Sequence, residues 1–479
     1  MRKIFSLFSL FSLFSLLTII FILNTFNSLA QTGKNQMAGS WLGTLEVGAL
    51  HLRLVFNLSV NEKDSLTATL DSPDQGAKNI PLGKVIFTGD SLMIEAPLLS
   101  GRYDGRIVSD TEINGTWQQS GQKFPANLRK LPAQFTLNRP QEPKPPFPYR
   151  SEEVSVPNKK FNIYLSGTLT IPEGEGPFPA AVLITGSGAQ NRDEELMGHK
   201  PFLVLADYLT RHGIAVLRYD DRGVGKSKGN YTTATSADLA TDAEAAYLFL
   251  SGHKDINNSF IGLIGHSEGG LLSCMTASSN PGIAFVISLA GQGVKGEEIL
   301  FRQQADIGRA SGMSEAALMD ARDINRQLYA VVKKEKDNLK AEKKVMETYL
   351  GILKKKRLSS REIDESMAQL SSSFNASVYP WFRYFLTADP ATYWENVKCP
   401  VLALNGEKDL QVAADVNLPA IEKALKAGGN NNVTVKSFPQ LNHLFQHCST
   451  GLPAEYGKIE ETISIEVLDT ITRWIRSLK

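Results

Sequence analysis

Three residue types that together carry out acyl chemistry follow apolar runs at separate points in the chain. Ser267 stands in Gly265-His266-Ser267-Glu268-Gly269, after the run FIGLI and before the helix-like segment GGLLSCMTAS. A serine on a tight strand-to-helix turn exposes its hydroxyl at a helix N-terminus, where a substrate can reach it. Glycine and serine also recur by chance in loops, so the flanking strand and helix patterns are what favour a nucleophile over a plain turn.

The acid and the base that a serine nucleophile needs follow two later apolar runs. Asp409 comes after VLALNG and His443 after VTVKSFP, which gives the chain order Ser, Asp, His. In such a set the histidine takes the hydroxyl proton, while the carboxylate fixes the histidine tautomer and stabilises the imidazolium. Glu407, Asp415 and His447 are nearby alternatives, and each residue alone is typical of a solvated loop. Their joint occurrence at successive strand ends favours a catalytic triad.

Acyl transfer also needs hydrogen-bond donors for the oxyanion of its transition state. We predict that the backbone N–H of Glu268, immediately after the serine, supplies one of them. The turn Gly186-Ser187-Gly188 supplies the other, through the N–H of Ser187 or, one residue on, that of Gly188. A phosphate-binding loop is the alternative for this turn, but it lacks the P-loop lysine and the full dinucleotide fingerprint.

The elements that must position these residues follow Tyr149, where short apolar runs alternate with helical patterns. Such runs are typical of strands buried on both faces, so we predict an α/β fold with a mostly parallel sheet. Ligands of such sheets bind beyond the carboxyl ends of the strands, where the candidate residues fall. Residues 295–380 lack a strand pattern and predict a helical cap. Acids within its lysine-rich runs favour solvated helix faces over a surface for polyanions.

The sequence before Tyr149 has a different pattern. Every even position from Leu50 to Val60 is apolar, which predicts a half-buried strand, and shorter alternations continue to Leu128. We therefore predict a small antiparallel β domain over residues 31–130, with a structural or carbohydrate-contacting role favoured over a fatty-ligand cavity. The proline-rich residues 131–149 predict a semi-rigid linker, and a hydrolase-like domain spans residues 150–479.

The first thirty residues predict export from the cell. Arg2 and Lys3 precede a long apolar run, and Ser28 and Ala30 precede the expected cut, as in a secretory signal peptide. We expect cleavage after Ala30 and a periplasmic or extracellular protein. An uncleaved single-span anchor is the alternative, because the apolar run is long for a signal peptide.

The charge and the cysteine content of the chain indicate which partners and cross-links to expect. The chain of 479 residues has a formal net charge of +1, which gives no reason to expect nucleic acid as a partner. The three cysteines, Cys274, Cys399 and Cys448, cannot all pair within one molecule, and we expect free thiols. We expect no metal, no cofactor and no stable membrane association after signal cleavage. The sequence does not indicate an oligomeric state.

Residues 150–479 resemble the α/β-hydrolase fold superfamily, in particular its cap-bearing bacterial esterases and serine-aminopeptidase-like members. The resemblance rests on LITGSGAQNRDE, RYDDRGVGKS, GLIGHSEGG, NGEKDL and LNHLF, in family order. It implies a Ser-His-Asp hydrolase with Ser267, His443 and Asp409 as the triad and with Arg222 as a structural residue. The oxyanion turn begins Thr185-Gly186 and so departs from the commoner His-Gly start.

We expect a serine hydrolase that cleaves carboxylic esters with short or medium acyl chains through an acyl-enzyme intermediate. Its substrate would be a small-molecule or glycan-linked ester. An aminopeptidase-like enzyme is the first alternative; it needs an acidic anchor for the substrate's amino group, and the cap offers Glu297, Glu298 and Asp306. A catalytically inactive secreted binding protein is the second alternative, which the complete set of Ser, Asp and His disfavours.

Overall fold

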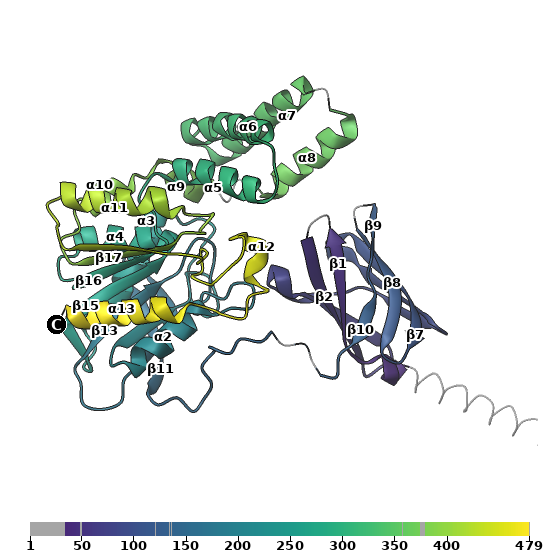
Figure 1. Cartoon of the computed structure of the whole chain (residues 1–479), viewed down its shortest axis with the longest axis horizontal. Coiled ribbons are helices and arrows are strands. Elements are labelled where there is room, and N and C mark those ends of the chain that lie inside the picture. Colours follow the sequence, from purple (N-terminus) through teal and green to yellow (C-terminus); the bar gives the residue numbers. More distant parts are fainter. Residues whose placement is uncertain are drawn as a thin grey trace, which may run out of the picture. The chain divides into compact units, whose positions relative to one another are not determined.

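The computed structural model describes residues 34–47, 50–119, 121–133, 135, 137–356, 358–373 and 379–478. The chain forms two compact units that divide between Asn138 and Arg139, within the predicted linker (Figure 1). The expected signal peptide lies outside the described residues, so its cleavage stays a prediction. Within the described ranges, no helix has the length and apolar character needed to cross a membrane.

The N-terminal unit is an antiparallel half-barrel, as the alternating patterns predict. Its strands lie in the order β4-β3-β2-β1-β10-β8-β7-β6-β5, with β9 paired to β8. Their bounds are β1 (Gly39–Val47), β2 (Leu50–Val60), β3 (Leu66–Ser72), β4 (Ala77–Pro81), β5 (Val85–Thr88), β6 (Ser91–Ala96), β7 (Gly101–Ser109), β8 (Glu112–Gln119), β9 (Gln122–Pro125) and β10 (Leu128–Lys130).

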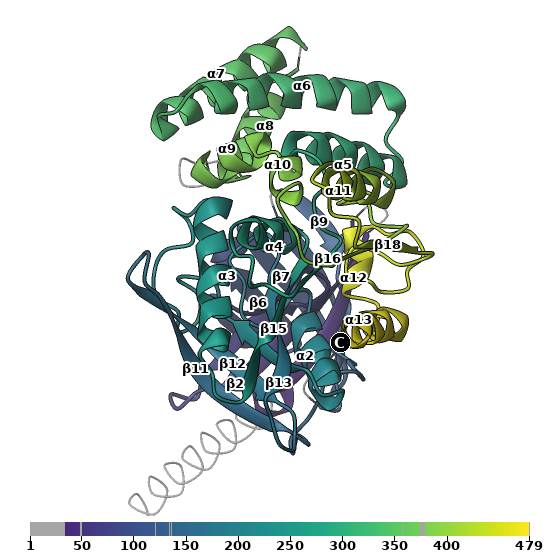
Figure 2. The ribbon, with the colours of Figure 1, turned by 90° about the vertical axis from the view of Figure 1, so that its left-hand side faces the viewer.

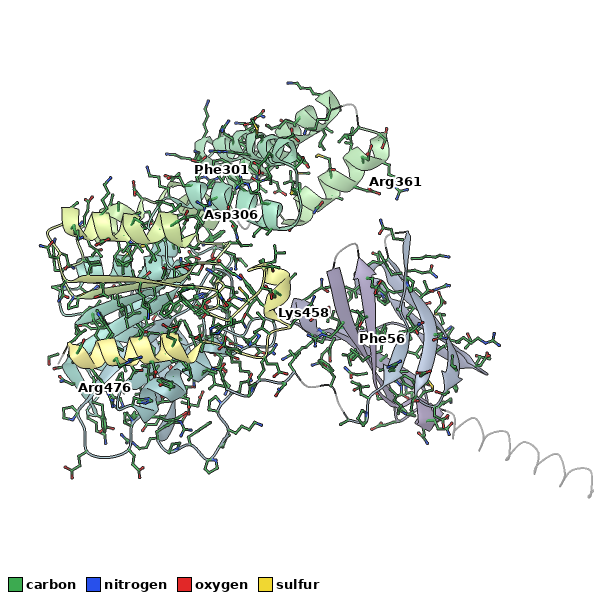
Figure 3. The ribbon with its side chains drawn as sticks, in the orientation of Figure 1. Phe56, Phe301, Asp306, Arg361, Lys458 and Arg476 are labelled. Carbon is green, nitrogen blue, oxygen red and sulfur yellow. The ribbon has the colours of Figure 1, made fainter. Side chains whose placement is uncertain are left out.

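Aromatic side chains form the centre of this half-barrel. Phe56, labelled in Figure 3, has its ring centroid 5.2 Å from that of Tyr103 and 6.1 Å from that of Trp117. All three side chains are buried, and such ring pairs add to the stability that apolar burial gives. A Cβ placed on Gly115 would lie 2.2 Å from the Tyr103 hydroxyl, so the ring needs a glycine on the neighbouring strand.

The C-terminal unit is built on an eight-stranded sheet of order β11-β12-β14-β13-β15-β16-β17-β18. Strands β11, β12 and β14 pair antiparallel, and every pair from β13–β14 to β17–β18 is parallel, which confirms the mostly parallel prediction. The bounds are β11 (Arg150–Asn158), β12 (Ile163–Ile171), β13 (Phe178–Ile184), β14 (Ala215–Tyr219), β15 (Ile256–His266), β16 (Phe285–Leu289), β17 (Val401–Gly406) and β18 (Val433–Phe438).

Helices cover both faces of this sheet (Figure 2). On one face lie α3 (Ser236–Ser251), α4 (Glu268–Ser279), α10 (Pro390–Trp394) and α11 (Ala414–Ala427); on the other lie α2 (Pro201–Arg211) and α13 (Ile465–Ser477). In β13, Val182 packs against the helices of the first face, whereas Ala181 and Leu183 pack in the apolar core on the face of α2 and α13. The central strands β13, β14, β16 and β17 are buried along almost their whole length, because helices cover both of their faces.

The chain between β16 and β17 forms the predicted helical cap. Its helices are α5 (Gly296–Ala310), α6 (Glu315–Lys334), α7 (Asn338–Lys355), α8 (Ser360–Ser373) and α9 (Tyr379–Thr387). They share a small core in which the ring of Tyr329 lies 5.5 Å from those of both Phe301 and Phe382. The cap is therefore held by its own apolar contacts.

Candidate active site

Ser267 lies between β15 and α4 in a strained turn. Its φ of 53° and ψ of −118° fall where residues with side chains rarely lie, and such strain is typical of functional sites. A Cβ on Gly265 would be 1.9 Å from the carbonyl oxygen of Gly269, and one on Gly269 would be 2.1 Å from that of Ile184. Packing therefore demands both glycines of the motif, and the turn sets the partly exposed serine at the N-terminus of α4.

The loops after β17 and β18 bring Asp409 and His443 together. His443 Nδ1 lies 2.7 Å from Asp409 Oδ2, and both side chains are buried. The other carboxylate oxygen, Oδ1, accepts the backbone N–H groups of Gln411 at 2.8 Å and Val412 at 2.9 Å. These two donors fix the carboxylate, which holds Nδ1 as a donor and leaves Nε2 as the proton acceptor.

The loop that carries His443 packs against the turn that carries Ser267. The rings of His443 and His266, the residue before the serine, have centroids 4.7 Å apart. His266 Nε2 also donates a hydrogen bond of 2.9 Å to the carbonyl oxygen of His443. Among the described side chains, no hydrogen bond joins the Ser267 hydroxyl to His443. Such contacts are often long before a substrate binds and tighten in the reacting complex.

The alternative acids and base have other partners. Asp415 is 66% exposed and pairs with an arginine of the cap. Glu407 accepts a hydrogen bond from a serine of β18. His447 is 59% exposed and pairs with Glu461. The structure therefore brings together the acid and base that the sequence favoured.

One N–H of the turn after β13 is free to bind an oxyanion. The N–H of Gly186 donates to Glu194 at 2.8 Å, and that of Gly188 donates to the Tyr231 hydroxyl at 2.9 Å. Between them, the N–H of Ser187 has no acceptor within the part of the chain that the structure describes. Ser187 is therefore better placed as a donor than Gly188.

The second free N–H belongs to Glu268. As the first residue of α4 it has no acceptor among the described residues, because the helix offers none to its first N–H groups. The turn after β13 lies against the serine, since a Cβ on Gly186 would be 3.2 Å from the Cβ of Ser267. Both predicted oxyanion donors thus border the nucleophile.

The sequence model of X-Pro dipeptidyl-peptidase (S15 family) matches residues 162–429, more than half of the chain. The chain belongs to the S15 family. This membership confirms the predicted α/β-hydrolase fold and makes the protein a hydrolase. The narrower likeness to serine aminopeptidases stays a prediction.

Two curated relatives are hydrolases as well. Esterase EstD from Thermotoga maritima is 27% identical over 315 residues, which are 65% of this chain and 65% of EstD. The 2,6-dihydropseudooxynicotine hydrolase of Paenarthrobacter nicotinovorans is 30% identical over 225 residues, which are 45% of this chain and 51% of that enzyme. The chain thus spans less than two-thirds of either relative. Among solved structures, Pyrococcus furiosus esterase Pf2001 has 16% identity and a TM-score of 0.41, over 72% of this chain and 97% of that one.

The Glu268 side chain of this S15-family hydrolase was missed by the sequence prediction, which considered the backbone of this residue alone. Its Oε1 accepts hydrogen bonds from Ser236 at 2.6 Å and from Trp381 Nε1 of cap helix α9 at 2.8 Å. Burial raises the pKa of this carboxyl, and Oε2 has no partner among the described residues. The carboxyl therefore links the nucleophile helix to the cap.

A buried carboxyl braces the turn after β13. Asp221 accepts hydrogen bonds from the Thr185 hydroxyl at 3.0 Å and the Gln190 N–H at 2.9 Å, and burial raises its pKa to about 8. The next residue, Arg222, pairs with Asp242 at 2.7 Å, with both side chains almost fully buried. This pairing agrees with the structural role that the resemblance implies for Arg222.

A cavity of about 820 Å³ opens between cap helix α5 and helix α11. Asp409 reaches its wall, but the other lining residues include the charged side chains Arg302, Asp306 and Asp415; Asp306 is labelled in Figure 3. Within the described ranges, no group of three or more His, Cys, Asp or Glu side chains is arranged to hold a metal ion. The cavity thus has charged walls beside the acid of the candidate triad.

Proposed function

We propose that this S15-family hydrolase cleaves carboxylic esters with short or medium acyl chains through an acyl-enzyme on Ser267. The observation that carries the proposal is the buried His443–Asp409 pair, packed against the strained serine turn that two free N–H groups border. The similarity to EstD, which is named an esterase, supports an ester as the substrate.

In acylation, the loops after β13, β15, β17 and β18 supply the oxyanion donors, the nucleophile, the acid and the base. His443 Nε2 takes the hydroxyl proton as Ser267 Oγ attacks the ester carbonyl, and Asp409 stabilises the imidazolium. The N–H groups of Ser187 and Glu268 donate to the oxyanion, and their positions are set before the substrate arrives. The imidazolium then gives its proton to the departing alkoxide, which leaves the acyl group on the serine.

Deacylation runs the same steps with water in place of the alcohol. His443 takes a proton from the water as its oxygen attacks the acyl carbon, and the same donors bind the second oxyanion. The proton returns to Ser267 Oγ as the carbon–oxygen bond breaks, which frees the acid and restores the enzyme.

A peptidase is the second candidate, because the matching family is described as an X-Pro dipeptidyl-peptidase. Two of the three cap acids proposed to anchor an amino group already have partners. Glu297 pairs with Lys333 at 2.6 Å, and Asp306 pairs with Arg302 at 2.6 Å. Glu298 is exposed. These contacts favour an ester substrate over one with an anchored amine.

Activity on p-nitrophenyl acetate and butyrate, compared with aminoacyl- and dipeptidyl-naphthylamides, tests the choice of substrate. Dominant amide cleavage would replace the ester proposal with the peptidase. Ser267→Ala should lower turnover by about four to six orders of magnitude. A full-rate variant would remove Ser267 from the mechanism, and absence of any hydrolysis by the wild type would favour the binding protein.

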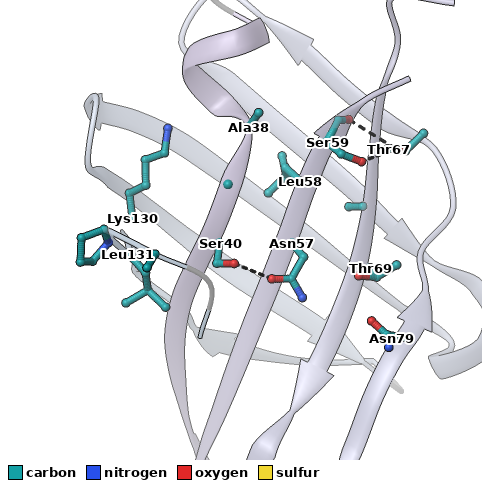
Figure 4. Close-up of a pocket in the computed structure, with 14 residues that line it drawn as sticks. Ala38, Ser40, Asn57, Leu58, Ser59, Thr67, Thr69, Asn79, Lys130 and Leu131 are labelled. Atoms are coloured by element: carbon teal, nitrogen blue, oxygen red, sulfur yellow. Dashed lines mark hydrogen bonds between the residues drawn. The ribbon is translucent and has the colours of Figure 1, made fainter. Parts of the chain in front are cut away.

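We further propose that the half-barrel contacts a glycan-linked substrate. A groove of about 590 Å³ runs over its polar face, where Ser40 donates to Asn57 at 2.7 Å and Ser59 contacts Thr67 at 2.9 Å (Figure 4). Hydroxyl and amide groups of this kind bind sugar hydroxyls. Asn57→Leu should weaken retention on polysaccharide and leave p-nitrophenyl acetate hydrolysis unchanged; equal retention would contradict this role.

We also propose that the protein is exported from the cell, because its N-terminal sequence resembles a secretory signal peptide. Cell fractionation, with the mature N-terminus determined by mass spectrometry, should place the protein outside the cytoplasm with a new terminus after Ala30. A full-length cytoplasmic protein would exclude it.

A further inference from the structure

A buried acid–histidine pair lies beside the candidate triad and takes no part in the mechanism above. Glu194 Oε1 accepts hydrogen bonds from the N–H of Gly186 at 2.8 Å and from His266 Nδ1 at 2.9 Å. The other ring nitrogen, His266 Nε2, donates to the carbonyl oxygen of His443 at 2.9 Å. The Glu194 and His266 side chains are only 3% and 8% exposed, so water does not replace these bonds.

The three hydrogen bonds require two protons on the pair. His266 Nε2 must carry a proton, because a carbonyl oxygen can only accept. A second proton must lie between Nδ1 and Glu194, either on the imidazolium beside a carboxylate or on the carboxyl group beside a neutral ring. In both arrangements the pair is neutral overall and all three bonds are made. Removing one proton leaves a ring nitrogen lone pair facing an oxygen, so one bond is lost.

The pair connects three separate parts of the site. Gly186 precedes the oxyanion donor Ser187 in the turn after β13, His266 precedes the nucleophile, and the carbonyl acceptor belongs to the candidate base, His443. No short stretch of chain joins these parts, since they come from the loop after β13, the end of β15 and the loop after β18. Glu194 is itself held at a φ of 53°, which residues with side chains rarely adopt. Backbone strain here is offset by the contacts that the carboxylate makes.

We propose that Glu194 and His266 are positioning residues, which hold the oxyanion turn, the nucleophile turn and the His443 loop in one reactive arrangement. The proposal rests on the proposed serine-hydrolase function and concerns the same site. Neither side chain touches the reacting atoms; each acts through the backbone groups that it fixes. An error of about 1 Å in such positions costs on the order of 100-fold in rate.

A second buried histidine shows what the carboxylate adds. His199 Nε2 lies 3.0 Å from both the carbonyl oxygen of Tyr456 and the side-chain nitrogen of Gln446, and its Nδ1 lies 3.0 Å from the Thr462 hydroxyl. Burial, together with the positive charge of Arg139, lowers the pKa of His199 to about 4. Burial acts on His266 in the same direction, yet Glu194 raises the pKa of that ring above its ordinary value. The carboxylate thus keeps the second proton on the pair.

Three variants test the proposal: Glu194→Gln, His266→Gln and the double variant. Glu194→Gln keeps the size and Oε1 of the side chain but cannot share a proton, so one of the three hydrogen bonds is lost. We expect kcat on p-nitrophenyl butyrate to fall about 10- to 100-fold with KM changed less than about threefold. The rate of fluorophosphonate labelling of Ser267 should fall in parallel, because labelling uses the same donors and base. The double variant should lose no more than the worse single variant.

Asp207→Asn is the matched control. It removes a partly buried carboxylate of the same unit, paired with Arg211 at 2.8 Å on helix α2, and should leave kcat and the labelling rate unchanged. Thermal denaturation of every variant separates loss of fold from loss of position. If Glu194→Gln does not fold, His266→Gln decides the outcome by the same measurements.

The result that overturns the proposal is a folded pair variant with lower melting temperature but wild-type kcat and labelling rate, which would make the pair purely structural. Additive losses in the double variant would also overturn it. A failure of the proposed function looks different: Ser267→Ala would then keep its activity, or the wild type would not label at Ser267.

Discussion

Asp409→Asn should disable the candidate base without disturbing the loop that holds it. In the wild type, Asp409 Oδ1 accepts the N–H groups of Gln411 and Val412, and Oδ2 accepts His443 Nδ1. An asparagine must keep its oxygen toward the two backbone donors. If the amide turned, its NH₂ group would face the N–H groups of both Gln411 and Val412, and neither would have an acceptor. Its NH₂ group therefore faces His443, which makes Nδ1 an acceptor and moves the ring proton to Nε2. A protonated Nε2 cannot take the proton of Ser267.

The expected loss follows from that tautomer. The same substitution in a Ser-His-Asp triad lowers kcat about 10⁴-fold, and we expect about 10³- to 10⁴-fold here, or about 4 to 5.5 kcal/mol of transition-state stabilisation. Steady-state hydrolysis of p-nitrophenyl butyrate measures kcat, and thermal denaturation checks that the variant is folded. KM should change little, because the substrate does not contact the buried carboxylate.

Asp415→Asn and Glu407→Gln are the matched controls, since both acids lie near Asp409 in sequence and have other partners. Each should keep kcat within about twofold of the wild type. A folded Asp409→Asn enzyme within tenfold of wild-type kcat would refute the assignment of the acid. So would an Asp415→Asn enzyme that loses as much activity as Asp409→Asn.

Three further substitutions test other parts of the structure. Trp381→Phe removes one hydrogen bond to the buried Glu268 carboxyl and should lower the free energy of unfolding by about 1–3 kcal/mol; an unchanged denaturation midpoint would mean that the cap contact is not formed. Because burial raises the folded pKa of Asp221 from its ordinary value of 3.8 to about 8, stability should fall as pH rises from about 4 to about 8 and level off above 8, and Asp221→Asn should flatten the fall in melting temperature over that range. Tyr103→Phe removes a buried hydroxyl that has no partner among the described residues and should leave stability unchanged or raise it by up to about 1 kcal/mol; a clear loss would reveal a hidden hydrogen bond.

The nucleophile turn could be predicted from sequence because its requirements are local. A Cβ on Gly265 would lie 1.9 Å from the carbonyl oxygen of Gly269 within the turn, and a Cβ on Gly269 would lie 2.1 Å from that of Ile184 on the neighbouring strand β13. Any chain that makes this turn must carry small residues at those two positions. The apolar runs of the parallel strands are equally local signals, since a strand covered on both faces has no solvent side to mark with polar residues.

The sequence favoured Asp409 but left Glu407 and Asp415 as alternatives, because the choice among these acids depends on burial. Asp409 and Asp415 are six residues apart after the same strand, yet the first is fully buried against two N–H groups and the second is 66% exposed. Glu194 and His266 were missed for a related reason. They are 72 residues apart in the chain, and the second occupies a variable position of the serine motif, so that only the folded sheet reveals their contact.

Backbone strain locates the site independently of any motif. The described residues include ten non-glycine residues with positive φ, and six of them lie in loops at the carboxyl ends of β13, β15, β16 and β18. These six are Glu194, Met197, Ser267, Ala290, Gln440 and Phe445. Each such conformation costs about 1–3 kcal/mol and persists where the surroundings over-determine it. The sheet and its two helical layers supply that surplus of packing, and three of these four loops, those after β13, β15 and β18, hold Ser267, His443 and the free N–H groups. Because strained backbone of this kind is often found where reacting groups must be held in place, its concentration in these loops supports the assignment of the site.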